Sequence, residues 1–124
     1  KNGLRALALS GSLQSGSLVR ANEEAQAIRQ TGSNQSVNHL RPNGTKFSTE
    51  ANLRGFGSGL YGENLAVVNN QGSVQAVAQR FVALWINSPG HRANILKARY
   101  TATGVTAYQL PNGQYIGMQE FAGR

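Results

Sequence analysis

A helical pattern that runs into a Ser-Pro-Gly-His step constrains the fold of this chain more than any other feature. In "GSVQAVAQRFVALWINSPGHRANIL", apolar side chains fall on one helix face: Val74, Val77, Ala78, Phe81 and Trp85. Ser73 stands where a helix N-cap is expected, and Pro89 fits the first position of a second helix that extends to about Leu96. The pattern therefore predicts two consecutive helices, the first with an apolar face to bury against another layer.

His91 lies in the first turn of the second predicted helix, directly after Pro89 and Gly90. Unpaired N–H groups and the positive end of the helix dipole surround that position, and they disfavour an imidazolium ion. A neutral imidazole is the form that binds a metal or accepts a proton. The position also suits a histidine that merely neighbours a helix cap, so this stretch alone leaves both interpretations open.

The rest of the chain predicts further helices and an antiparallel hairpin. A row of apolar side chains before Gly32 indicates one helix: Leu18, Ala21, Ala25 and Ile28. A short helix is expected from Thr49 to Arg54. Near the end, "TGVTAYQLPNGQYIGMQEFAG" alternates around a Pro-Asn-Gly turn, as strands of a hairpin do. This order predicts an α+β fold in which helices pack on a small antiparallel sheet.

Composition limits the chemistry that the chain can perform. Its 124 residues predict one domain over 1–124, and the absence of cysteine excludes disulfides, thiolate zinc sites and a cysteine nucleophile. All five acids are Glu, so neither an EF-hand loop nor a Ser-His-Asp triad can form. The glycine spacing of "GSGLYG" matches a dinucleotide loop, but the strand, helix and carboxylate that such a site needs are missing. No apolar run approaches the ~20 residues of a membrane span.

The charge is strongly positive, with twelve Lys and Arg against five Glu and a formal net charge of +7. The basic residues are spread along the chain rather than clustered, and few aromatic residues lie among them. This pattern favours a general attraction to anionic surfaces, or simply a solvated basic surface. We therefore do not expect nucleic acid as a partner.

Two histidines and one acid remain as candidates for a site. His39 lies in "NHLRPNG", Glu63 in "YGENLA" and His91 in "SPGHRANIL". Two imidazoles and a carboxylate can bind zinc and leave a position open for water. Their wide spacing is not that of a local metal motif, so only the fold can bring them together. A surface histidine and a solvated acid remain the alternative for His39 and Glu63.

Five segments together resemble the CAP superfamily, which includes cysteine-rich secretory proteins, antigen 5 and plant pathogenesis-related proteins. They are "NGLRAL", "NHLRPNGTKFST", "YGENLA", "WINSPGHRANIL" and "TGVTAYQLPNGQYIGMQEFA", and they run from about Asn2 to Ala122. The chain is most similar to the short, secreted bacterial branch that is often called SCP-like. The combination of "GEN" with the Trp-to-Leu segment makes the resemblance specific.

The resemblance implies both a fold and a site. The fold is an α-β-α sandwich, with a three-stranded antiparallel sheet between helical layers. The site is a cavity that can hold a divalent metal, typically zinc, and the matching positions here are His39, His91 and Glu63. Three further matching positions are expected to act as scaffold, the two asparagines by hydrogen bonds to loop backbone: Asn64, Arg92 and Asn94.

The chain departs from the family pattern in two places. Many members carry a second acid three residues after the tryptophan, whereas this chain has Ser88, so we expect modest zinc affinity. The family also begins with a helix before the "NGL" segment, and here that helix is expected to be missing. Its loss would expose apolar surface for a partner or a second copy to cover, which predicts possible self-association.

The resemblance leaves several functions open. We expect a secreted, extracellular, non-catalytic domain with a cleft for a lipid or sterol, an anionic cell-envelope polymer or a host component. The alternative is a zinc-dependent hydrolase or peptidase, in which Glu63 would orient or deprotonate a zinc-bound water. A polyanion binder driven by charge ranks last. The two histidines and Glu63 could also form only a buried hydrogen-bonded cluster that links the loops.

Overall fold

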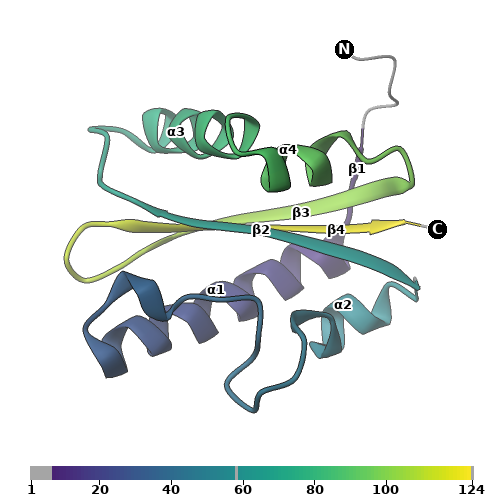
Figure 1. Ribbon diagram of the computed structural model, residues 1–124, viewed down its shortest axis with the longest axis horizontal. Coiled ribbons are helices and arrows are strands. Elements are labelled where there is room, and N and C mark those ends of the chain that lie inside the picture. Colours follow the sequence, from purple (N-terminus) through teal and green to yellow (C-terminus); the bar gives the residue numbers. More distant parts are fainter. Residues whose placement is uncertain (1–6, 58, 124) are drawn as a thin grey trace.

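The computed structural model describes residues 7–57 and 59–123. Its sheet lies between two helical layers, with α1 and α2 on one face and α3 and α4 on the other (Figure 1). The helices are α1 Gly11–Thr31, α2 Ala51–Gly55, α3 Val74–Ile86 and α4 Pro89–Leu96. This arrangement confirms the predicted α-β-α sandwich. Within the described ranges, no helix combines the length and apolarity needed to cross a membrane.

The sheet has the strand order β1-β3-β4-β2. Its strands are β1 Ala8–Leu9, β2 Leu60–Val68, β3 Tyr100–Gln109 and β4 Tyr115–Gly123. β4 pairs antiparallel with both β2 and β3, so the antiparallel sheet and its C-terminal hairpin are confirmed. The sequence did not predict β1, which pairs parallel with β3, because a two-residue strand is too short to show an alternating pattern.

Helix α1 is the longest helix and covers the centre of the sheet (Figure 1). Ser10 caps it by accepting a hydrogen bond from the Leu13 N–H, and Gly32 ends it in a left-handed conformation, as predicted. Its buried stripe contains Ala21, Ala25 and Ile28, but the Leu18 side chain is 48% exposed, so that prediction was wrong. The buried stripe also contains small and charged residues that the apolar pattern did not include: Gly16, Ser17, Arg20 and Glu24.

Helix α3 begins after the predicted N-cap Ser73 and packs over β2. Val77, Phe81 and Trp85 are buried, which confirms most of the predicted apolar face. Val74 and Ala78 are exposed, contrary to the prediction. The contact stripe of α3 follows the i, i+4 row, so residues one step away from that row face solvent.

The middle of the chain forms short elements between α1 and β2. A 3₁₀ turn over Phe47–Thr49 leads into α2, where the side chain of Glu50 accepts the N–H groups of Asn52 and Leu53. The predicted helix over Thr49 to Arg54 is therefore present with slightly shifted bounds. The cap leaves Glu50 buried under the turn it stabilises.

The outer edge of β3 is closed by a side chain from α1. Beyond the two residues of β1, the Gln14 amide accepts a hydrogen bond from the Val105 N–H at 2.9 Å and donates one to the Val105 carbonyl. This amide takes the place of a neighbouring strand at that residue, so it protects an otherwise open sheet edge.

An apolar groove of about 260 Å³ lies between α3, α4 and the exposed face of β3. Its lining includes Val82, Ile86 and Val105, each at least 38% exposed. The family resemblance predicted that a helix before the "NGL" segment is missing. This prediction concerns a part of the chain outside the described residues. The groove is the surface at which the predicted self-association can be examined.

Candidate functional site

Glu63 of β2 forms the centre of a buried ionic network with Arg20 of α1. The Arg20 Nε donates to Glu63 Oε2 at 2.8 Å, and its Nη2 donates to Glu63 Oε1 at 3.0 Å. Both side chains are fully buried. Two parallel charge-assisted hydrogen bonds fix the carboxylate in one orientation, which is the geometry that guanidinium groups favour.

Arg20 also ties this carboxylate to α1 and to the loop that follows it. Its Nη1 donates to Glu23 at 2.9 Å and to Glu24 at 3.1 Å, and its Nη2 donates to the Asn38 carbonyl at 2.9 Å. Burial alone would lower the pKa of Arg20, but the hydrogen bonds and charge of Glu63 raise it above its ordinary value. A single guanidinium therefore joins α1, β2 and the loop.

Glu120 of β4 stands directly opposite Glu63 in the sheet and is also buried. Burial raises the pKa of Glu120 well above its ordinary value, and the neighbouring charge of Glu63 adds to this effect. Within the part of the chain that the structure describes, no N–H or hydroxyl donor reaches its oxygens. Burial without a hydrogen-bond donor and the facing charge of Glu63 both favour the protonated, neutral form of Glu120.

Glu63 remains ionised in these surroundings. Burial works to raise its pKa, but hydrogen bonds from His39 and Arg20 lower it below the ordinary value. The two facing carboxyls thus have pKa values shifted in opposite directions.

His39 reaches the network from the loop after α1. Its Nδ1 lies 2.9 Å from Glu63 Oε1, while 52% of its side chain is exposed. The chain is fixed there because the His39 carbonyl accepts the Phe47 N–H at 3.0 Å, and because Leu40 and Lys46 form a β-bridge across a turn. The Nε2 atom of His39 has no hydrogen-bond partner within residues 7–57 and 59–123.

His91 lies in the first turn of α4 and is partly buried. Burial lowers its pKa, and the charge of nearby His39 lowers it further, so the neutral imidazole is favoured. The sequence argument based this preference on the helix dipole, and the structure adds burial and the nearby His39 as further causes. Pro89 occupies the first helical position as expected, but the Ser88 side chain makes no cap hydrogen bond.

The predicted scaffold asparagines connect β2 to α4. Asn64 Nδ2 donates to the His91 carbonyl at 3.2 Å, and Asn94 Nδ2 donates to Asn64 Oδ1 at 2.9 Å and to the Glu63 carbonyl at 3.3 Å. These bonds hold the backbone of His91 beside the strand that carries Glu63. Arg92 is exposed on α4, and its side chain forms no ion pair among the described residues.

The structure therefore brings the three predicted site residues into one region, although their roles differ. His39 and Glu63 are in direct contact, and His91 lies close enough to His39 for their charges to interact. In the described ranges, no group of three or more His, Cys, Asp or Glu is arranged to hold a metal ion. The metal set of His39, His91 and Glu63 thus stays a prediction.

Three network residues were missed from the sequence: Arg20, Glu24 and Glu120. Each lies in phase with a buried stripe. Arg20 and Glu24 continue the row of Leu13, Ser17 and Ile28 on α1, and Glu120 lies on the same face of β4 as the buried Ile116 and Met118. A charge in phase with a buried face is the signal that could have found them, because such a charge needs a partner.

Comparison with known proteins gives a match to one family model, described as the cysteine-rich secretory protein family (CAP), over residues 1–121. No curated protein matches the chain. Among solved structures, it is similar to an outer surface protein of Borrelia burgdorferi, with 20% sequence identity and a TM-score of 0.68. That alignment covers 98% of this chain and 80% of the other.

Two longer bacterial proteins contain a similar domain. An extracellular protein with an SCP domain from Bacillus anthracis has 24% identity and a TM-score of 0.66, with 98% of this chain and 35% of that one covered. A cysteine-rich secretory protein of Staphylococcus aureus has 15% identity and a TM-score of 0.61, with 98% and 33% covered. At these identities the similarity shows a shared fold.

Proposed function

The chain belongs to the cysteine-rich secretory protein (CAP) family, and we propose that it is a secreted binding domain, not an enzyme, whose two histidines hold a divalent metal ion. The match of residues 1–121 to the family model establishes the family. Secretion is supported by the descriptions of two similar structures, one as an outer surface protein and one as an extracellular protein.

The main support for this proposal is the pair of hydrogen bonds that Arg20 donates to Glu63. Both oxygens of Glu63 accept hydrogen bonds from Arg20, and Oε1 also contacts His39, so the carboxylate is not free to take a proton from water. An ionised carboxylate only accepts hydrogen bonds, so Nδ1 of His39 carries the proton. Glu63 therefore orients His39 and leaves Nε2 as the ligand atom, as carboxylates behind metal-binding histidines do.

The donor set fits a metal held by few protein ligands. Two neutral imidazoles suit zinc, but catalytic zinc sites normally have three protein ligands and structural sites four. The position of the second family acid is Ser88, which supplies no negative charge. A bound ion would add a Lewis-acidic centre whose other positions are open to water or ligand. We expect modest affinity, and a lipid or sterol, a host component or an anionic cell-envelope polymer as the further ligand.

Titration calorimetry with zinc tests this assignment. Wild type is compared with His39→Ala and His91→Ala, and with Gln75→Ala as a control at an exposed position of α3. We expect both histidine variants to lose the zinc heat and the control to keep it. Glu63→Gln should weaken binding by roughly 10- to 100-fold if Glu63 orients His39. Equal zinc binding by all variants would contradict the proposal that His39 and His91 bind the metal.

The hydrolase alternative predicts a different result. If Glu63 deprotonated a zinc-bound water, a metal-dependent turnover would be measurable and would vanish in Glu63→Gln while zinc binding survived. Such an outcome would contradict a purely binding role.

A further inference from the structure

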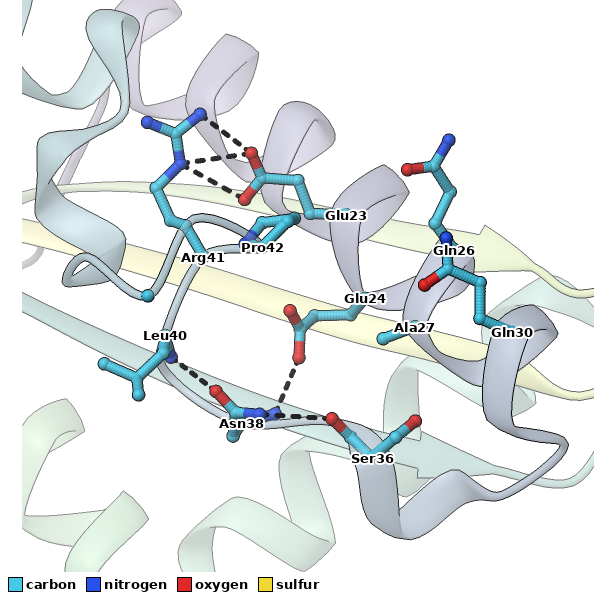
Figure 2. Close-up of a pocket in the computed structure, with 11 residues that line it drawn as sticks. Glu23, Glu24, Gln26, Ala27, Gln30, Ser36, Asn38, Leu40, Arg41 and Pro42 are labelled. Atoms are coloured by element: carbon cyan, nitrogen blue, oxygen red, sulfur yellow. Dashed lines mark hydrogen bonds and ion pairs between the residues drawn. The ribbon is translucent and has the colours of Figure 1, made fainter.

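A second cavity, with both polar and apolar lining, lies between the C-terminal half of α1 and the loop 36–44, next to the chain neighbours of His39. It has a volume of about 330 Å³. Figure 2 shows its two walls, with Glu23, Gln26 and Gln30 on the helix and Asn38 and Arg41 on the loop. Neither His39, Glu63 nor His91 lines it. The cavity is therefore a separate candidate for ligand binding.

The charged groups of this cavity neutralise one another in place. Arg41 Nη2 donates to Glu23 Oε2 at 2.8 Å, and Arg41 Nε bonds the same carboxylate (Figure 2). Glu24, which is 3% exposed, accepts the Asn38 N–H at 2.6 Å and the Arg20 Nη1 at 3.1 Å. An incoming ion would find no unpaired charge among these carboxylates and guanidinium groups. The cavity thus selects for an uncharged ligand.

Two side-chain amides are left free on the helical wall. Gln26 and Gln30 are exposed and form no side-chain hydrogen bond with the described residues. They lie four residues apart, about 6 Å along the helix axis, on the same side of α1. Each amide offers two donors and an acceptor. Ala27 on the helix and Pro42 on the loop add small apolar surfaces, whereas the Leu40 side chain points away from the helix (Figure 2).

We propose that this cavity binds a short, uncharged oligosaccharide. Hydroxyl and acetamido groups present donors and acceptors side by side, which is what the amides of Gln26 and Gln30 can pair with. The C–H face of a sugar ring suits the small apolar surfaces of Ala27 and Pro42. A peptide is less well matched, because the walls are a helix and a loop and offer neither a free strand edge nor an apolar groove. Since no aromatic side chain of the described residues lines the cavity, we expect weak binding, with a Kd on the order of 1 mM.

Triacetylchitotriose, a neutral trimer of N-acetylglucosamine, is the probe that tests this site. Nitrogen-15 NMR titration of the whole chain should give saturable shifts at the side-chain amides of Gln26 and Gln30. The double variant Gln26→Ala/Gln30→Ala should raise the Kd at least ~10-fold, since about two hydrogen bonds are lost. Alanine is a strong helix former, so α1 should remain folded.

The chain offers a matched control on the opposite layer. Gln75 and Gln79 are also exposed glutamines four residues apart, on α3, and Gln75→Ala/Gln79→Ala should bind the trimer like wild type. His91→Ala should also keep sugar binding, which separates this site from the metal site. Unsaturable shifts, or equal affinity in the Gln26/Gln30 variant, would overturn the proposal. Tighter binding of trialanine than of the trimer would assign the cavity to a peptide and equally contradict it.

Discussion

Arg20 forms more ion pairs than any other residue of the described chain. It bonds Glu63, Glu23 and Glu24 at once while fully buried. Burying these charges is costly, and the network is favourable only because every charge has a partner. Its value to the molecule lies in placing Glu63, and through it His39, in one position.

Replacing Arg20 with Met should expose that dependence. Arg20→Met keeps much of the side-chain volume but leaves Glu63 and Glu24 buried without their counter-charge. We expect the free energy of unfolding at neutral pH to fall by about 3–5 kcal/mol. Urea unfolding measures the loss, and Arg80→Met, at an exposed position of α3, should change it by less than about 0.5 kcal/mol. Similar losses in both variants would argue against a structural role of the network.

Glu120 gives the stability of the protein a distinct dependence on pH. Its pKa is raised in the folded state, so its contribution is complete below the unfolded pKa of about 4.3 and is lost as pH rises towards the folded pKa. Glu120→Gln imitates the neutral acid, because its amide carries no charge at any of these pH values. The variant should therefore gain stability over wild type as pH rises from acid to neutral, with a slope of up to about 1.4 kcal/mol per pH unit. Parallel unfolding profiles for the two proteins would contradict a neutral Glu120.

The residues of this network also show what sequence reasoning can and cannot find. His39, Glu63 and His91 were identified through a family resemblance, which fixes positions but not contacts. Arg20 looks like a solvent-facing charge on a helix, and its partner is 43 residues away. The pairing of Glu63 with Glu120 depends on the β2–β4 register, which the sequence does not specify.

At the level of elements, the contact between α1 and β3 depends on a glycine. A Cβ at Gly104 would lie on the backbone of Leu13 and Gln14, so only glycine permits this close approach. The contact sets how deeply α1 sits on the sheet and therefore where Arg20 meets Glu63. Helix bounds followed from caps and stop signals such as Ser73 and Gly32, whereas this packing distance had no visible signal in the sequence.

Gly104→Ala should push α1 away from the sheet. Because the clash is with backbone rather than a flexible side chain, we expect a loss of about 1–3 kcal/mol in the free energy of unfolding, or more if the helix cannot shift. Gly11→Ala at the start of α1 is the control, since a Cβ there meets nothing within 4 Å. Chemical denaturation of both variants checks this, and an unchanged Gly104→Ala stability would mean that α1 is not held at that distance.

At the scale of the whole molecule, three layers place a loop, a strand and a helix around one buried carboxylate. The layer order could be predicted because each helix and the hairpin carry their own local signals. The sequence could not predict which strands each helix covers. α3 packs over β2 and leaves an apolar groove beside β3. This position depends on tertiary packing and not on a local sequence signal. Val74 and Ala78 are exposed because α3 packs in this position.

The central claim is that Glu63, held by Arg20, orients His39 so that it and His91 can bind one metal ion. Anomalous diffraction from crystals soaked in zinc tests this most directly. The account predicts one peak bonded to His39 Nε2 and a nitrogen of His91, with the Arg20–Glu63 pair intact behind it. A peak bonded directly to Glu63 after the ion pair has opened, or no peak between the imidazoles, would contradict it.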